Sequence, residues 1–361
     1  MRRSCGRPGC AASTPPRIST SRASWARSST SSRSHSLGTE LTQRLLARER
    51  DAIPEALNLV DDRRPERRRE ALALLDALER RAPFPGAARI GFTGAPGAGK
   101  STLLDALLRL LRARGRSVGV VAVDPSSRRS GGALLGDRIR MRSSGTDPGV
   151  FIRSMAARDQ LGGVADAAWA SVALLSAVFD CVLVETVGVG QSESEVSELV
   201  DTLAFVANPG TGDALQFMKA GVLELPDVFV VNKADVGPEA RRTASELESS
   251  LRLTARDADD WLAPVLLVSA REVRGIDALA DALDAHRQWL SQGDRLAARR
   301  AAGAEAHVVE SLVRRYGSHG LERLGGADGV TARMREQPST GAFAWLDLLG
   351  REIEDALRKP A

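Results

Sequence analysis

The sequence contains few of the residues that build disulfide frameworks and metal centres. There are three cysteines in 361 residues; Cys5 and Cys10 lie near the start, and Cys181 lies inside an apolar segment. This number and spacing produce neither a disulfide framework nor a zinc site, which indicates a reducing, cytoplasmic compartment. Cys181 is expected to be a small core residue with no redox or nucleophilic role.

Histidine and long apolar runs are also scarce. No metal-ligand spacing relates the four histidines, which are expected to be surface or packing residues: His35, His286, His307 and His319. The most apolar stretch, 164–184, is interrupted by polar residues such as Asp166 and falls short of the roughly 18 apolar residues that a membrane span needs. We therefore expect a soluble globular protein without a membrane span, and its 43% hydrophobic content can fill a sizeable core.

The charge balance gives no support to a nucleic-acid partner. The chain carries a formal net charge of +4, but residues 1–39 hold seven arginines and no acidic residue. The rest of the chain then has 43 basic against 46 acidic residues, a net charge of −3. Since the main body is not basic, we do not expect it to bind nucleic acid.

The first segment, 1–38, is rich in serine and arginine and lacks apolar periodicity. Such a composition cannot bury enough surface to fold alone, so a disordered leader is expected. It superficially resembles an organellar transit peptide, and translation from a start placed too far upstream gives the same pattern. Both origins stay open.

The remaining chain divides into three parts. Residues 39–84 show apolar residues at helical spacing and predict two amphipathic helices, with Pro65 in the first turn of the second. Residues 85–292 alternate helical patterns with short Val-, Ile- and Leu-rich runs, which predicts an α/β fold with a mostly parallel sheet and helices on both faces. The expected strands lie within 88–94, 116–124, 149–154, 179–185, 201–208, 226–235 and 263–270. Residues 293–361 predict a C-terminal helical extension.

A glycine-rich loop follows the first predicted strand and precedes a helix. The segment GAPGAGKST has the spacing of a phosphate-binding loop, in which backbone N–H groups surround phosphates at a helix N-terminus. Lys100 would reach the β- and γ-phosphates, and Ser101 would hold Mg²⁺. The predicted nucleotide contacts are Gly94, Ala95, Pro96, Gly97, Ala98, Gly99, Lys100, Ser101 and Thr102.

Two later loops predict that the base is guanine. Asn232, Lys233 and Asp235 follow a buried strand, where the aspartate can accept hydrogen bonds from the guanine N1–H and amino group. The segment at Ser269, Ala270 and Arg271 follows the next strand, and the Ala270 backbone N–H would suit the guanine O6.

Acidic residues end further strands on the same side of the sheet. Glu185 would bear on Mg²⁺ or its waters, and Gly188 would offer its backbone to the γ-phosphate. Asp124 is the candidate for positioning the attacking water, and Asp137 is the candidate for a further magnesium ligand. The predicted catalytic set is Lys100, Asp124 and Glu185; the predicted metal set is Ser101, Asp137 and Glu185.

Several of these segments together resemble the MeaB/ArgK family, GTPases associated with methylmalonyl-CoA mutase. They are GAPGAGKST, VAVDPSS, GGALLGDRIRM, VETVGVGQSE, GTGDALQFMKAG, VNKAD and SAREVRGID, in this order along the chain. The resemblance covers about residues 40–350. It implies a P-loop GTPase of the class shared with signal-recognition-particle proteins and MinD.

The resemblance also implies a partner and a way of working. A MeaB-like protein would be a chaperone for an adenosylcobalamin-dependent mutase, gating cofactor loading and protecting the mutase. It would form a homodimer through its C-terminal helices, would bind no cobalamin itself, and would work alongside a cobalamin adenosyltransferase. Its switch and coupling residues would be Gly190, Gln191, Asp213, Gln216 and Lys219.

Three alternatives remain open from the sequence. GTP occupancy alone could set the conformation, with hydrolysis incidental. A related metal-insertion GTPase would instead need a His/Cys cluster, for which the sequence shows no spacing. The client could be methylmalonyl-CoA mutase or a similar isobutyryl-CoA or ethylmalonyl-CoA mutase.

Overall fold

The centre of the molecule is a parallel β-sheet. The computed structural model describes residues 40–62, 64–81, 86–125, 147–157, 163–186, 192–210, 225–252 and 259–358. In this part of the chain, seven parallel strands pair in the order β3-β2-β4-β1-β5-β6-β7. They are β1 (Ala88–Thr93), β2 (Val118–Pro125), β3 (Val150–Ala157), β4 (Cys181–Glu185), β5 (Thr202–Ala207), β6 (Val228–Val231) and β7 (Val265–Leu267).

The sheet is apolar on both faces, which confirms the predicted fold class. Along β4, Cys181 and Leu183 pack on one side, whereas Val182 and Val184 pack on the other. Strands of this kind must be covered by helices on both faces. On the first face lie α4 (Lys100–Ala113) and α9 (Ile276–Leu290); on the second lie α5 (Gly163–Val178), α6 (Ser192–Leu199) and α8 (Pro238–Leu251).

The N-terminal helices differ in one respect from the prediction. Helix α3 (Pro65–Arg81) begins at the predicted proline. The first predicted helix, however, is divided into a helical segment at 40–46 and α2 (Ala52–Asp61). Arg48, between them, has a φ of 60°, a left-handed conformation that a continuous helix cannot contain.

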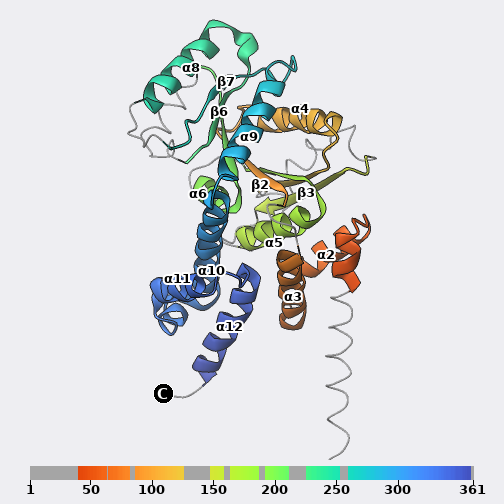
Figure 1. Ribbon diagram of the computed structural model, residues 1–361, viewed down its shortest axis with the longest axis vertical. Helices are drawn as coiled ribbons and strands as arrows, with labels where there is room; N and C mark the ends of the chain where they lie inside the picture. The colour runs from red at the N-terminus through yellow and green to blue at the C-terminus, as the bar shows by residue number, and fades with distance from the viewer. Residues whose placement is uncertain are drawn as a thin grey trace, which may run out of the picture.

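The C-terminal extension is helical, as predicted. It consists of α10 (Arg295–Glu322), α11 (Gly326–Glu336) and α12 (Ala342–Arg358). Helix α10 runs away from the sheet, and α12 lies near α3 below α5 (Figure 1). Gly317, with φ 70° and ψ 178°, interrupts the helical conformation within α10.

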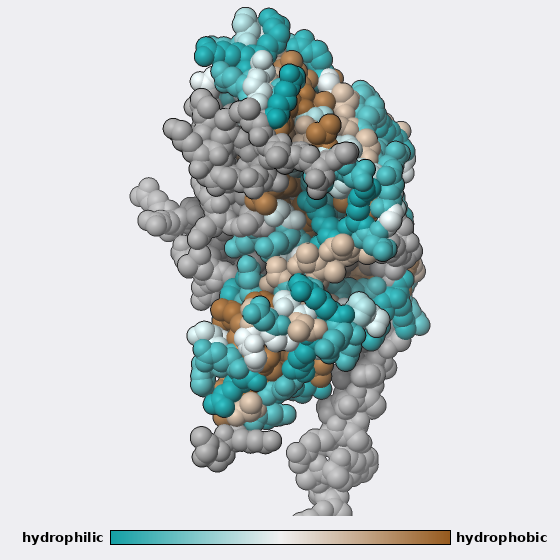
Figure 2. Space-filling view, turned by 60° about the vertical axis from the view of Figure 1, so that its left-hand side comes forward, coloured by the Kyte–Doolittle hydropathy of each residue, from teal (hydrophilic) through white to brown (hydrophobic). Residues whose placement is uncertain are grey.

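Polar residues cover much of the coloured surface on the face that Figure 2 shows. Large apolar side chains are exposed at scattered positions, namely Val236, Leu262, Leu267, Val273, Val313, Leu348 and Leu357. None of the helices in the described ranges is both long and apolar enough to cross a membrane.

Candidate nucleotide site

The loop between β1 and α4 can only be built with glycine at two positions. Gly94 has a φ of +135°, and a Cβ there would lie less than 3.0 Å from the Val206 carbonyl oxygen of β5. Gly99 has a φ of +88°, and its Cβ would lie 2.6 Å from the Asn232 Nδ2. Both the conformation and the close approach disfavour other residues. The loop is therefore pressed against the end of β5 and the loop that follows β6.

Lys100 and Ser101 start α4 and make different contacts. The Lys100 ammonium group is buried and donates to the carbonyl oxygens of Gly94, at 2.7 Å, and Ala95, at 3.1 Å. The Ser101 hydroxyl donates to the Glu185 Oε1 at 2.7 Å. The lysine thus lies over the loop, and the serine faces the end of β4.

The strand order explains how Glu185 comes to face Ser101, 84 residues away in the sequence. β4 is the neighbour of β1, and Glu185 is in register with Phe92, just before the glycine-rich loop. The Glu185 side chain is only 1% exposed. A buried carboxylate and a hydroxyl at a helix start make a suitable oxygen pair for a hard divalent cation. The metal prediction for Ser101 and Glu185 is consistent with this geometry.

The two predicted guanine loops also lie together. The Ala270 backbone N–H donates to the Asn232 Oδ1 at 3.2 Å, and the Ser269 hydroxyl donates to the Asp235 Oδ1 at 2.7 Å. The hydrogen bond from Ser269, followed by the Asp235 backbone and the nearby Arg271 and Arg274, lowers the pKa of Asp235. These contacts favour the ionised form of Asp235, which lies in the 3₁₀ helix η2 (Ala234–Val236).

The base loop and the phosphate loop form one bonded unit, a relation that the sequence did not reveal. The Asn232 amide donates to the carbonyl oxygen of Ala98 at 2.8 Å. The Lys233 ammonium donates to that of Gly97 at 2.8 Å. Lys233 adopts a φ of 58°, a left-handed conformation that is uncommon outside glycine.

The remaining predicted residues are placed only in part. Pro96, Thr102 and Arg271 are exposed at or near the two loops. The Asp124 backbone lies near the end of β2, paired with Ala156 of β3 and two residues beyond the residue that pairs with Glu185, but its side chain lies outside the described residues. Also outside the described residues are Asp137, Gly188, Gly190, Gln191, Asp213, Gln216 and Lys219.

Three residues with reactive side chains are packing residues, namely Cys181, His286 and His307. Burial raises the pKa of the Cys181 thiol to about 12, so the thiolate is disfavoured. Burial likewise lowers the pKa of His286 and of His307 to about 4, so both rings are neutral at pH 7. His286 contacts the Thr202 hydroxyl at 2.9 Å, and His307 stacks on Trp169 with ring centroids 4.3 Å apart.

The comparisons with known proteins identify the family. Residues 53–319 match the family model described as "Methylmalonyl Co-A mutase-associated GTPase MeaB". The chain belongs to this family. The resemblance read from the sequence motifs is therefore confirmed, and the protein is a GTPase of the MeaB family.

Of three relatives of this MeaB family protein, two are described as GTPases and one is named for methylmalonic aciduria. A protein of Mycobacterium tuberculosis described as a probable GTPase is 46% identical over 256 residues, covering 70% of this chain and 75% of the relative. The GTPase ArgK of Escherichia coli is 40% identical over 261 residues, with coverages of 71% and 78%. The methylmalonic aciduria type A homolog of Mus musculus, a mitochondrial protein, is 37% identical over 269 residues, with coverages of 71% and 64%.

A solved structure supports the same fold. The crystal structure of a LAO/AO transport system kinase is 29% identical, with a TM-score of 0.63, and the match covers 90% of this chain and 98% of that one.

Proposed function

We propose that the protein binds GTP across the two bonded loops and hydrolyses it with Mg²⁺. The observation that carries this proposal is the double role of Asn232, which bonds to Ala98 in the phosphate loop and to Ala270 in the base loop. The phosphate loop and the base loop are then held at a fixed distance from each other before the nucleotide binds. Preorganisation of this kind reduces the entropic cost of binding.

Guanine recognition is assigned to Asp235. Its carboxylate is an acceptor, and guanine offers it two N–H donors. In Asp235→Asn, an NH₂ donor replaces one of the two carboxylate oxygens, and this donor suits the C2 carbonyl of xanthine. We expect GTP affinity to fall about 100-fold, since two hydrogen bonds to a charged group are affected, and xanthosine triphosphate to bind better than GTP.

The measurement is titration with fluorescent GTP and xanthosine triphosphate. Asp259→Asn, at an exposed aspartate outside both loops, is the matched control. If Asp235→Asn retained the wild-type preference for GTP, the assignment of the base site would be wrong.

The oxygen pair of Ser101 and Glu185 would hold the magnesium ion, and Asp137 is proposed as a further ligand. When bound, the ion supplies positive charge to the β- and γ-phosphate oxygens. In this proposal, the Lys100 ammonium group gives up its hydrogen bonds to the carbonyl oxygens of Gly94 and Ala95 when the nucleotide binds, and donates to phosphate oxygens instead. Gly188 would contact the γ-phosphate, and Asp124 would orient the attacking water.

A single substitution can show whether protection of a mutase needs GTP hydrolysis or only bound GTP. We expect Asp124→Asn to reduce the turnover of GTP about 100-fold, the lower range for a positioned general base, with GTP affinity kept within about threefold. If such a variant still protected a mutase, occupancy alone would suffice. If protection were lost together with hydrolysis, the hydrolysing mechanism would be supported.

The proposed partner is an adenosylcobalamin-dependent acyl-CoA mutase, with methylmalonyl-CoA mutase as the first candidate. The family description names that mutase, and a relative carries the name of methylmalonic aciduria. The protein would gate cofactor loading and protect the mutase as a cytoplasmic homodimer, with a cobalamin adenosyltransferase as a further contact. Gly190, Gln191, Asp213, Gln216 and Lys219 are the proposed switch and coupling residues.

The test of the partner uses the protein from Glu40 onward. Its GTP turnover is measured alone and with each candidate mutase. Stimulation by one mutase would identify the client, whereas tight GTP binding without stimulation by any would remove the mutase from the proposal and leave the nucleotide chemistry.

The metal-insertion alternative finds no support in the described part of the chain. No group of three or more His, Cys, Asp or Glu residues there could hold a metal ion. His286 and His307 are buried in packing contacts.

A further inference from the structure

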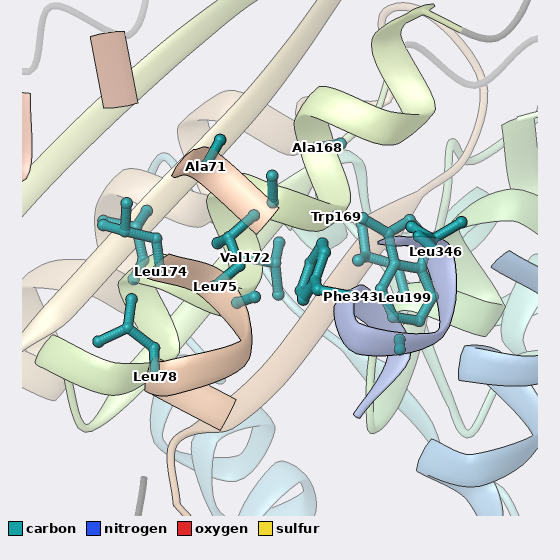
Figure 3. Packing of buried hydrophobic residues seen from close by; sticks show 14 of the residues in the cluster. Ala71, Leu75, Leu78, Ala168, Trp169, Val172, Leu174, Leu199, Phe343 and Leu346 are labelled. Atoms are coloured by element: carbon teal, nitrogen blue, oxygen red, sulfur yellow. The ribbon is translucent and has the colours of Figure 1, made fainter. Parts of the chain in front are cut away.

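The helices around the nucleotide-binding domain and the C-terminal helices share one apolar core. Figure 3 shows Trp169 of α5, Leu199 of α6, and Phe343 and Leu346 of α12 gathered together. His307 of α10 lies between them, stacked on Trp169 and edge-on to Phe343 with ring centroids 6.3 Å apart. The C-terminal helices are therefore in direct contact with α5 and α6.

Helix α6 is held between two glycines. On one side, a Cβ at Gly91 of β1 would lie 2.8 Å from the Val196 Cγ1. On the other side, a Cβ at Gly303 of α10 would lie less than 3.0 Å from the Glu198 carbonyl oxygen. Gly91 lies three residues before Gly94 of the phosphate loop. Because both contacts are closer than a Cβ would allow, a shift of α6 towards either glycine would have to move β1 or α10.

A charged cluster lies further along the same interface. Arg314 of α10 pairs with Asp166 of α5 at 2.6 Å and with Glu310 at 2.9 Å. Burial and the nearby Glu310 raise the pKa of both Glu195 and Glu198 of α6, and Arg314 opposes this effect. Arg314 therefore ties α10 to α5 by an ion pair at this interface.

The start of α10 is fixed to the sheet by ion pairs, whereas its helical conformation is interrupted near its end. Arg299 and Arg300 make bidentate ion pairs with Asp227 and Asp201, next to β6 and β5. The contact with α6 at Gly303 comes one turn later. The break at Gly317 then separates this part of α10 from its last residues.

We propose that α6 relays the occupancy of the phosphate loop to the C-terminal helices through α10, with Gly303 as the backbone contact to α6 and the Arg314–Asp166 ion pair as the tie between α10 and α5. Helix α6 begins immediately after residues 187–191, which include Gly188, the residue proposed to contact the γ-phosphate. The relay rests on the proposed function, since it needs two nucleotide states. Thermodynamic coupling is reciprocal, so changes in α10 must alter the preference of the site for GTP over GDP.

The experiment uses the full chain, with GDP and the slowly hydrolysed analogue GTPγS. Gly303→Ala and Arg314→Gln are compared with Ala302→Ser and Arg323→Gln, which make similar changes at exposed positions of α10 and its end. Two quantities are measured: the ratio of the GDP and GTPγS dissociation constants, and the hydrogen exchange of α11 and α12 in each nucleotide state.

In the wild type, we expect exchange in α11 and α12 to differ between GDP and GTPγS. Gly303→Ala and Arg314→Gln should remove this difference and change the ratio of dissociation constants about fivefold or more, the usual lower range of allosteric coupling. Both controls should behave as the wild type. Arg314→Lys, which keeps the charge, should restore part of the effect. A purely structural role would weaken the binding of both nucleotides equally and leave the ratio unchanged.

Two results separate the relay from the proposed function. If the wild type binds both nucleotides but α11 and α12 exchange identically in the two states, the relay is wrong and the nucleotide site stands. If the wild type binds no guanine nucleotide, both proposals fail. Should Gly303→Ala not fold, Arg314→Gln alone decides: an unchanged ratio with that variant overturns the relay.

Discussion

The contact between α3 and α12 predicts an unusual dependence of stability on pH. Glu79 of α3 accepts hydrogen bonds from the backbone N–H groups at Ala342 and Phe343, where α12 begins. Burial nevertheless raises the pKa of Glu79 from 4.5 to about 7, with Arg89 opposing the effect and Asp76 adding to it. The folded protein thus binds this proton more tightly than the unfolded chain does. Stability from this group is complete below pH 4.5 and is lost as the pH rises to about 7.

The size of the effect follows from the two pKa values. The loss across this interval is about 3 kcal/mol, since each pKa unit corresponds to about 1.4 kcal/mol. Glu79→Gln keeps an acceptor for the helix N-terminus but cannot ionise. Above pH 7 we therefore expect it to be more stable than the wild type by up to about 3 kcal/mol, and the difference should shrink towards pH 5.

Urea unfolding at several pH values between about 5 and 8 measures this difference. Glu66→Gln, at an exposed position of the same helix, is the control and should leave the pH dependence unchanged. A stability difference between Glu79→Gln and the wild type that stayed constant over this range would refute the reasoning.

Three further outcomes test the site and its supports. Gly94→Ala forces a side chain against the Val206 carbonyl at a φ of +135°; we expect a loss of about 3 kcal/mol in urea unfolding, and an unchanged stability would contradict the close approach. Arg300→Met leaves the buried Asp201 without its bidentate partner; it should cost about 3–5 kcal/mol in the same assay, and a loss below 1 kcal/mol would show that other groups compensate. Ser101→Ala should lower GTP turnover about 10-fold, as expected for one lost bond to a charged partner, and raise the magnesium concentration needed for half-maximal rate; an unchanged magnesium requirement would remove Ser101 from the metal site.

The sheet was predictable because its strands are apolar on both faces and short. Runs such as those at β4 and β6 carry Val with Leu or Phe and show no polar alternation, which is the pattern of a buried parallel strand. The start of α3 was predictable from Pro65. The break at Arg48 was not, because nothing in the local sequence favours a left-handed conformation at an arginine.

The candidate site was predictable as separate loops rather than as a unit. Spacing alone indicated the glycine-rich loop and the Asn-Lys-x-Asp segment, because the chemistry of each is local. The hydrogen bond from Asn232 to Ala98 joins residues 134 positions apart, so only the order of the strands could reveal it. Ser101 and Glu185 were expected in one metal site from the sequence, whereas the direct hydrogen bond between them and the contact of Glu79 with the start of α12 depend on packing between distant elements.

The ion pairs at the start of α10 have a consequence for the order in which the chain can mature on the ribosome. Asp227 is synthesised 72 residues before Arg299, and Asp201 is synthesised 99 residues before Arg300. Until both arginines have emerged, Asp227 lacks its bidentate partner and Asp201 keeps only Arg89 beside it, so the bases of β5 and β6 lack their main ion pairs. We therefore expect the sheet domain to reach its final form only together with the C-terminal helices. A nascent chain stalled before residue 299 should remain sensitive to proteases in β5 and β6, although all seven strands have already been made.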